Sequence, residues 1–544
     1  MSRLHSAYPR SLRSAAAVGL VAALAVGCTA ADADTTVAGR AAVGTSPLPT
    51  VPPAQPPAKL TRAKVETAVS RLDDVVHDAM HRTGVPGIAV GVVYDDKVMY
   101  LKGFGVRKVG TKDRVGADTV FQLASVSKPL ASTVVAAAVG EKTVGWDDPV
   151  VKYTPGFALK DPWVSSHVTL ADLFSHRSGL PDHAGDLLED LGYDRSYILD
   201  HLRYEPLAPF RAHYAYTNFG LTEAAVATAR AAGSNWEKLS ADKVYRPLGM
   251  DSTSSSFADY EKAGNKASLH VRTGSTWSAS YVRDPDAQSP AGGASSTVRD
   301  MTKWLRLQLD NGKFEGRQVV DADALEETHV PHMVSEPPHS PAGRTGFYGL
   351  GWNVSYDDQG RLKLGHSGGF ALGAATNVAL LPSEKLGIVV LTNGEPIGVP
   401  EAISATFLDT AQTGGPTVDW LKFLGPIFQQ TLQGERSQVD YSKPPASPAP
   451  AKANSAYTGT YANEYYGPLT VSARGNELTL QIGPKKQRFV LVHYDGDTFS
   501  YRTTGEMAVG LTGVTFTVGS GGRADKVRVE NLDTSGLGTF TRKG

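Results

Sequence analysis

The sequence predicts an α/β domain followed by a smaller all-β domain. Short apolar runs typical of strands lie at 87–94, 98–101, 374–381 and 386–392. The first two runs flank a polar turn and the last two flank a second one, so each pair is predicted to form a hairpin. Between the hairpins, apolar stretches near 130–139 and 221–232 have the length of helices. Strands at both ends with helices between them favour one α/β domain.

Two stretches rich in proline and alanine divide the chain. The stretches lie at about 34–59 and at 443–450, and such compositions stay extended rather than packing. Around them we expect a tether at 29–60 and a second linker at 413–455. The α/β domain therefore spans 61–412. The tail at 456–544 is rich in Gly, Thr, Val and Tyr with frequent turn signals, which is typical of an all-β domain.

Composition narrows the function classes. The chain has 544 residues, 41% of them hydrophobic, which is enough for a large core and a second domain. Its formal net charge of -1 offers no broad attraction to nucleic acid, so no nucleic-acid partner is expected. A single cysteine, Cys28, excludes an internal disulfide framework and a metal cluster built on cysteines.

The N-terminus has the pattern of an export signal. Three arginines precede an apolar run at 15–27, which is shorter than the roughly 20 residues that a spanning helix needs. The small residues before Cys28 resemble the box that precedes the modified cysteine of bacterial lipoproteins. We therefore predict a lipoprotein-type signal at 1–28 and a lipid anchor on Cys28 that holds the exported protein at the cell envelope. Cleavage after Ala33 is the alternative, and it would release a secreted or periplasmic protein.

The segment 121–129 carries the sharpest chemical signal. Ser125 and Lys128 are three residues apart where a helix-like run begins. On a helix this spacing places both side chains on one face at the N-terminus, where the dipole favours negative charge and a buried ammonium can lose its proton. A serine hydroxyl needs a base within hydrogen-bond reach, and a desolvated lysine supplies one. Ser125 is therefore a candidate nucleophile and Lys128 its candidate base.

The same spacing recurs at Ser240 and Lys243, which shows that it is weak evidence by itself. There the chain continues as a helix end that runs into a turn. We interpret Lys243 as a solvated surface charge.

Tyr216 and Asn218 form a second candidate element. A tyrosine held close to an ammonium can have its pKa lowered enough to exchange a proton. The asparagine amide can bind both Lys128 and a substrate carbonyl. The alternative is an aromatic core residue beside a loop asparagine, which is our interpretation of Tyr461 and Asn463 in the tail.

The segment 365–369 matches Gly-x-Ser-x-Gly, and this pattern is compatible with two different catalytic roles. As a nucleophile elbow, Ser367 would serve an α/β-hydrolase, which requires a helix after it and then an acid and a histidine. The sequence continues instead into the second hairpin, and His493 in the tail is the only histidine downstream. These features disfavour the elbow.

On the other interpretation, this segment is a strand beside Ser125 whose glycines let a substrate backbone approach closely. The backbone N–H groups of Ser125 and Gly369 would then bind an oxyanion, and His366 would hold a substrate carboxylate or pass a proton. Ser367 and Gly368 are the remaining candidates for substrate binding on this strand.

These three elements in this order resemble the penicillin-binding protein and class C β-lactamase superfamily of serine hydrolases over about 65–409. The resemblance implies an α/β (α+β) fold of the β-lactamase/transpeptidase type, with an antiparallel sheet flanked by helices and an all-helical subdomain. It implies Ser125 as nucleophile, Lys128 as base and Tyr216 as proton relay. Asn218 is implied to bind the substrate and the lysine.

The tail resembles a small β-barrel domain of unknown function that is appended to such hydrolases. We find no catalytic constellation in it. Packing of this domain against the first one, to narrow the cleft, is a hypothesis.

One departure from the family affects the expected activity. β-Lactamases of this group usually carry Lys-Thr-Gly where this chain has His366, Ser367 and Gly368, and histidine there is more often seen in D-peptidases and esterases of the superfamily. We therefore expect a covalent acyl-enzyme at Ser125 formed from small-molecule or peptide amides or esters. The activity would be that of a D-amino-acid peptidase, carboxypeptidase-like enzyme or esterase.

Two alternatives stay open, a class C-like β-lactamase and a penicillin-binding sensor or structural protein without turnover. No cofactor is implied, and a metal is not expected because histidines such as His332 and His339 form no recognisable ligand set.

Overall fold

The computed structural model describes residues 55–56, 58–434 and 436–544. The predicted signal peptide at 1–28, its lipidated Cys28 and most of the predicted tether lie outside these residues. Within the described ranges, no helix combines the length and the apolar character that a bilayer crossing requires.

An eight-stranded antiparallel sheet forms the centre of the first domain, in the order β2-β1-β14-β13-β12-β11-β10-β9. Its strands are β1 (Gly87–Tyr94), β2 (Lys97–Gly105), β9 (Met333–Glu336), β10 (Gly346–Tyr348), β11 (Asn353–Tyr356), β12 (Leu362–Phe370), β13 (Ala374–Leu381) and β14 (Leu386–Thr392). Both predicted hairpins are present, and β13 and β14 have the bounds that their apolar runs predicted.

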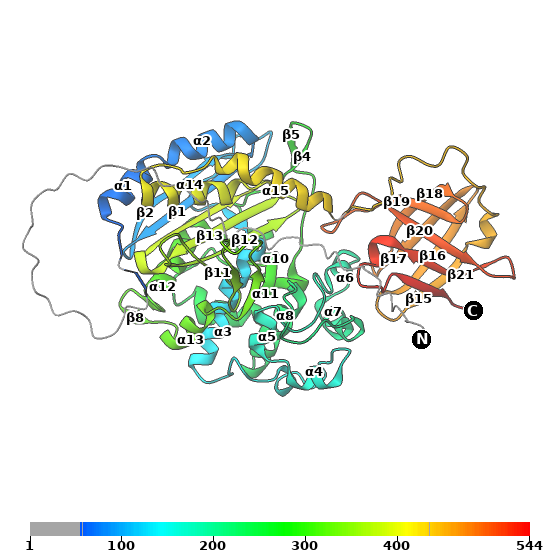
Figure 1. Cartoon of the computed structure of the whole chain (residues 1–544), viewed down its shortest axis with the longest axis horizontal. Helices are drawn as coiled ribbons and strands as arrows, with labels where there is room; N and C mark the ends of the chain where they lie inside the picture. The colour runs from blue at the N-terminus through cyan, green and yellow to red at the C-terminus, as the bar shows by residue number, and fades with distance from the viewer. Residues whose placement is uncertain (1–54, 57, 435) are drawn as a thin grey trace, which may run out of the picture.

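Strand β1 shows why both faces of the sheet are covered. Val90 and Val92 belong to one apolar core, whereas Ala89 and Val93 belong to the other. Successive side chains of a strand point to opposite faces, so a strand that is apolar throughout needs an apolar layer on each side. These layers are α1 (Arg62–Ser70), α2 (Leu72–Thr83) and α14 (Val399–Thr413) on one face and α12 (Val298–Leu309) on the other (Figure 1).

Helices fill the chain between the two hairpins. The two long ones predicted from the sequence are present as α3 (Ser127–Gly140) and α8 (Asn218–Ala231), each starting three residues before its apolar stretch. The shorter helices are α4 (Pro162–His167), α5 (Leu170–Phe174), α6 (Asp186–Asp190), α7 (Arg195–His201), α9 (Trp236–Ser240), α10 (Phe257–Lys262), α11 (Ser289–Gly292) and α13 (Ala322–Glu326). Three small two-stranded sheets pair β3 (Val120–Gln122) with β6 (Ser295–Thr297), β4 (Val271–Thr273) with β5 (Thr276–Ser278) and β7 (Lys313–Phe314) with β8 (Arg317–Gln318). Helix α15 (Trp420–Gly434) packs on α14 and lies within the predicted linker 413–455. This part of the segment is therefore helical rather than extended, because Trp420 and Leu424 are buried against α14.

The tail forms a closed eight-stranded antiparallel barrel, as the all-β prediction required. Its strands are β15 (Gly459–Asn463), β16 (Gly467–Arg474), β17 (Glu477–Ile482), β18 (Gln487–Asp495), β19 (Thr498–Arg502), β20 (Leu511–Val518), β21 (Ala524–Val529) and β22 (Thr539–Arg542). Tyr461 is fully buried in it, and its hydroxyl donates to the carbonyl oxygen of Tyr457 at 2.6 Å. Tyr461 is thus a core residue, as interpreted from the sequence.

The barrel packs against the helical part of the first domain, beside α6 and α7 (Figure 1). The Tyr193 hydroxyl donates to the carbonyl oxygen of Tyr466 at 2.7 Å, and the Gln487 amide donates to the carbonyl oxygen of Asp190 at 2.6 Å. The apolar core of the helices continues into the barrel without a break.

Candidate active site

Ser125 lies in a single 3₁₀ turn, Ala124–Val126, between β3 and α3. The sequence placed Ser125 and Lys128 together on a helix, and the structure puts Ser125 one turn earlier. A 3₁₀ turn has three residues per turn, so side chains three apart still face the same way. Ala124, which is buried, has a left-handed φ of 46°, a conformation that costs free energy in a non-glycine residue and concentrates at functional sites.

Lys128 is completely buried and contacts Ser125 directly. Its Nζ atom is 3.1 Å from Ser125 Oγ and donates to Asn218 Oδ1 at 2.7 Å and to the carbonyl oxygen of Ala291 at 3.0 Å. Burial lowers the pKa of Lys128 to about 7, and the negative charge of Asp186 opposes this shift. A large fraction of Lys128 is therefore a neutral amine near pH 7, which can accept the proton of a neighbouring hydroxyl.

The ring of Tyr216 lies beneath the same amine, with Lys128 Nζ 4.4 Å from the ring centroid. Burial raises the pKa of the Tyr216 hydroxyl far above its usual range, although its interaction with Ser125 opposes that rise. This is the reverse of the shift expected from the sequence, because desolvation outweighs the effect of an amine that is itself only partly charged. No contact of the hydroxyl with hydrogen-bond geometry occurs among the described residues. Tyr216 therefore holds its proton at neutral pH.

Asn218 is the first residue of α8, and both ends of its amide are engaged. Its Oδ1 faces Lys128, and its Nδ2 donates to Asp186 Oδ2 at 2.8 Å. Asp186 also contacts His183 Nδ1 at 2.7 Å. The carboxylate thereby fixes which way the amide points.

His366 lies on β12 and is buried. Its Nδ1 is 2.6 Å from the carbonyl oxygen of Ser367, which can only accept, so Nδ1 carries the proton and Nε2 accepts from the Tyr348 hydroxyl at 2.8 Å. Burial, with the nearby Lys128, lowers the pKa of His366 to about 3. At neutral pH the imidazole is therefore uncharged, with both nitrogens in contact with oxygen atoms. Holding a substrate carboxylate and passing a proton both stay predictions for His366.

Gly368 lies directly against the Ser125 turn. A Cβ at this position would be 2.2 Å from the carbonyl oxygen of Leu123 and 2.9 Å from the Ser125 nitrogen, so only glycine fits. Strand β11 pairs with β12 only as far as Gly365, while β13 pairs with β12 as far as Phe370. The free edge of β12 after Gly365 therefore faces Ser125.

Ser367 is a mid-strand residue. Its hydroxyl accepts from Asn377 Nδ2 at 3.1 Å, and β13 rather than a helix follows it. These facts remove the nucleophile-elbow interpretation.

A cavity joins the predicted residues. It is lined by Ser125, Tyr216, Asn218, His366, Ser367, Gly368 and Gly369. Further lining residues went unnoticed in the sequence, among them Asp186, Glu189, Asp190, Arg283, Glu401 and Glu506. They come from separate helices, a loop and the barrel and carry no shared motif, so no sequence signal marked them.

The second Ser-x-x-Lys pair has other partners. The hydroxyl of Ser240 donates to the carbonyl oxygen of Glu237 at 3.0 Å, and Lys243 forms an ion pair with Glu141 at 2.5 Å. Neither residue lines the cavity that contains Ser125.

Comparison with known proteins identifies the family. Residues 72–411 match the family model described as Beta-lactamase. The chain belongs to this family. It is a serine hydrolase of that family, since its relatives are named hydrolases, carboxypeptidases and β-lactamases. Residues 443–538 match a domain of unknown function, DUF3471.

Three curated relatives illustrate the range of this beta-lactamase family. The unguisins hydrolase ungD' of Aspergillus campestris is 27% identical over 434 residues, covering 75% of this chain and 79% of the relative. The D-alanyl-D-alanine-carboxypeptidase/endopeptidase AmpH of Escherichia coli K12 is 24% identical and covers 61% and 86%. Penicillin-binding protein 4 of Amycolatopsis lactamdurans is 27% identical and covers 70% and 94%.

Solved structures agree on the fold. The octameric penicillin-binding protein homologue from Pyrococcus abyssi has a TM-score of 0.55 at 20% identity and covers 85% of this chain and 98% of its own. A class C β-lactamase from Rhodobacter sphaeroides has a TM-score of 0.53 at 22% identity and covers 63% of this chain and 99% of its own.

Proposed function

We propose that this beta-lactamase-family hydrolase forms its acyl-enzyme on Ser125, with Lys128 as general base and Tyr216 as proton donor. The observation that carries the proposal is the desolvated amine of Lys128, 3.1 Å from Ser125 Oγ, with its pKa lowered to about 7. A base whose pKa lies near the working pH is largely present in its unprotonated form and is still basic enough to take a proton from the nucleophile.

The reaction has two steps. Neutral Lys128 takes the hydroxyl proton while Ser125 Oγ attacks an amide or ester carbonyl, and the backbone N–H groups of Ser125 and Gly369 bind the oxyanion. The leaving amine or alcohol receives a proton from Tyr216, which is reprotonated from Lys128. Water then attacks the ester carbon and gives a proton to neutral Lys128, which passes that proton to Ser125 Oγ as the acid departs.

The substrate class that we favour is a D-amino-acid peptide or an ester. A neutral His366 where related β-lactamases carry lysine supports this choice, and so does the relative named a carboxypeptidase/endopeptidase. The relative named β-lactamase, from Lysobacter lactamgenus, supports a class C-like β-lactamase as the second candidate. A penicillin-binding sensor that acylates without turnover is the third.

The test is incubation with p-nitrophenyl acetate and, separately, with a fluorescent penicillin. We expect Ser125→Ala to lose at least about 10³-fold in ester turnover and all labelling. Ser240→Ala, which changes the second Ser-x-x-Lys pair, should retain both. Slow release of the label supports a peptidase or sensor, and rapid β-lactam turnover supports a lactamase. Activity that survives Ser125→Ala would overturn the assignment.

We also propose export and lipid attachment at Cys28. The small-residue box before this cysteine and the short apolar run support it. Radioactive palmitate should label the wild-type protein and not Cys28→Ser when the two are expressed in a bacterium that processes lipoproteins.

A further inference from the structure

A loop of the C-terminal barrel reaches the cavity that contains Ser125. Glu506 and Met507, between β19 and β20, line this cavity, and their backbone N–H groups donate to the Asp190 carboxylate at 3.0 and 2.7 Å. A Cβ on Gly505, whose φ is 104°, would lie 2.6 Å from the same carboxylate. A glycine here is what lets the barrel loop approach α6 so closely.

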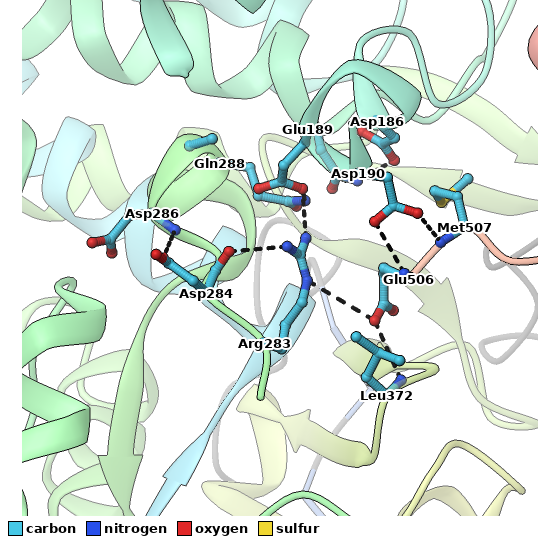
Figure 2. A network of polar contacts seen from close by, with 12 residues as sticks. Asp186, Glu189, Asp190, Arg283, Asp284, Asp286, Gln288, Leu372, Glu506 and Met507 are labelled. Carbon is cyan, nitrogen blue, oxygen red and sulfur yellow. Dashed lines mark hydrogen bonds and ion pairs between the residues drawn. The ribbon is translucent and has the colours of Figure 1, made fainter. Parts of the chain in front are cut away.

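The same loop is tied to the opposite wall of the cavity. The Glu506 carboxylate accepts from the backbone N–H of Ala371 at 2.6 Å and of Leu372 at 3.3 Å, in the turn between β12 and β13. It also lies 3.9 Å from Arg283 Nε (Figure 2). A barrel residue therefore bridges α6 and the strand that carries His366.

The wall made in this way is acidic. Five carboxylates line the cavity, those of Asp186, Glu189, Asp190, Glu401 and Glu506. Arg283 is the one arginine or lysine among the described residues that line it, and Arg283 pairs with Glu189 at 2.5 Å. Figure 2 shows Arg283 between Glu189 and Glu506. Carboxyl groups therefore outnumber basic side chains in the lining of the cavity.

Three of these carboxylates have an oxygen with no hydrogen-bond donor within the described part of the chain. They are Oε1 of Glu189, Oδ1 of Asp186 and Oε2 of Glu401, and the side chains of Glu189 and Asp186 are 6% and 5% exposed. A buried carboxylate oxygen without a donor is costly, which points to a donor supplied by a ligand. A primary ammonium has three N–H donors and no acceptor, so it fits such a wall.

The wall can change its protonation when a ligand binds. Burial raises the pKa of Glu401 and of Glu506 to about 7, and it also raises the pKa of Glu189 and of Asp190. A positive charge entering the cavity would favour the ionised carboxylates, whereas a substrate carboxylate would meet repulsion and find Arg283 already paired. Apolar side chains also line the cavity, among them Phe370, Phe428 and Met507.

We propose that this acidic wall, shared by α6 and the barrel loop, is a specificity-determining subsite for a primary ammonium group next to an apolar side chain. The substrate then carries a free amine, rather than a carboxylate, near the amide or ester that is cleaved. This inference rests on the proposed function, because it names the substrate class of the same site.

The first experiment compares three inhibitors of p-nitrophenyl acetate hydrolysis by the wild-type protein at pH 7. They are 2-phenylethylamine, the neutral 2-phenylethanol and the anionic 3-phenylpropanoate. We expect competitive inhibition with the Ki of the amine at least about tenfold below those of the other two, as one charge-assisted hydrogen bond requires.

The second experiment places the subsite on the barrel loop. Glu506→Gln keeps the size of the side chain and removes its charge, and we expect it to reduce the ratio of the alcohol Ki to the amine Ki from at least about tenfold to less than about threefold. Glu189→Gln, on α6, should act in the same direction. Glu464→Gln changes an exposed acid of the same barrel and should keep the wild-type ratio. Circular dichroism melting of each variant separates loss of recognition from loss of folding.

The outcomes distinguish the two proposals. Equal Ki values for the three compounds, or tightest binding of the carboxylate, with Ser125-dependent turnover intact would overturn the ammonium subsite alone. An unchanged ratio in folded Glu506→Gln and Glu189→Gln would overturn its placement on this wall. Turnover that survives Ser125→Ala, or no Ser125-dependent reaction at all, would overturn the proposed function itself.

Discussion

Asp186 accepts a hydrogen bond at 2.8 Å from the amide nitrogen of Asn218, and this contact turns the amide oxygen toward Lys128. Asp186 lies 58 positions beyond Lys128 in the sequence and belongs to none of the recognised motifs. Its charge nevertheless raises the pKa of Lys128, against the larger effect of burial.

Asp186→Asn should therefore shift the rising, low-pH part of the profile of kcat/KM against pH to lower pH. Lys128 acts as a base when deprotonated, so kcat/KM rises with pH through the pKa of Lys128 in the free enzyme, near 7. Without the carboxylate that pKa falls, and we expect the midpoint to shift to lower pH by about 1 unit. The profile is measured with p-nitrophenyl acetate. Asp251→Asn, at an exposed position, should leave the midpoint in place, and an unmoved midpoint in Asp186→Asn would argue against Lys128 as the base.

Lys128→Arg tests whether the amine must lose its proton. A guanidinium stays charged at any pH that the fold tolerates, so it cannot take the proton of Ser125. We expect kcat to fall by about 10²- to 10⁴-fold, the usual contribution of a general base. The matched control is Lys243→Arg, which should keep the wild-type rate because Lys243 pairs with Glu141 away from the cavity. Near-normal turnover by Lys128→Arg would remove the proton-transfer role.

Gly368→Ala tests the close packing of β12 on the Ser125 turn. The added methyl would lie 2.2 Å from the Leu123 carbonyl oxygen and 2.4 Å from Thr376 Oγ1, so the strand or the turn must move. We expect a loss of about 1–3 kcal/mol in the free energy of unfolding, together with reduced acylation of Ser125. Urea unfolding and penicillin labelling measure the two effects. Gly116→Ala, where nothing lies within 4 Å of the new methyl, should change neither.

Tyr348→Phe tests the hydrogen bond that holds His366. The substitution removes the donor to His366 Nε2 and leaves a buried acceptor unsatisfied. We expect a cost of about 1–3 kcal/mol in unfolding free energy. Thermal and urea unfolding are the measurements, with Tyr281→Phe at a half-exposed surface position as the control. Equal stability of the two variants would contradict the inferred proton position on His366.

The fold followed closely from local patterns. The hairpin strands β13 and β14 have the bounds of their apolar runs, because a short run that is apolar throughout and ends at a turn has few other ways to be buried. The contact between Ser125 and Lys128 was likewise predictable, since residues three apart lie on one side of a helical turn. The strand and turn signals of the tail predicted an all-β domain, and the family resemblance implied that it is the barrel that the structure shows.

The ionisation of the site did not follow from the sequence. The expected fall in the pKa of Tyr216 is a rise, and the pKa of His366 is lowered to about 3, because both side chains are buried. Burial depends on every segment that packs around a residue, so no single motif encodes it.

The sequence by itself determined the family, the two folded regions and the Ser125 to Lys128 pair, because each of these depends on residues that are close along the chain. Only the tertiary structure decided which charges surround that pair. Asp190 and Glu506 are separated by more than half of the chain and meet only because the barrel docks against α6. That docking adds Glu506 to the acidic wall, whereas the protonation of Lys128, Tyr216 and His366 follows from their burial in the first domain, since electrostatic effects act through space and grow as water is excluded.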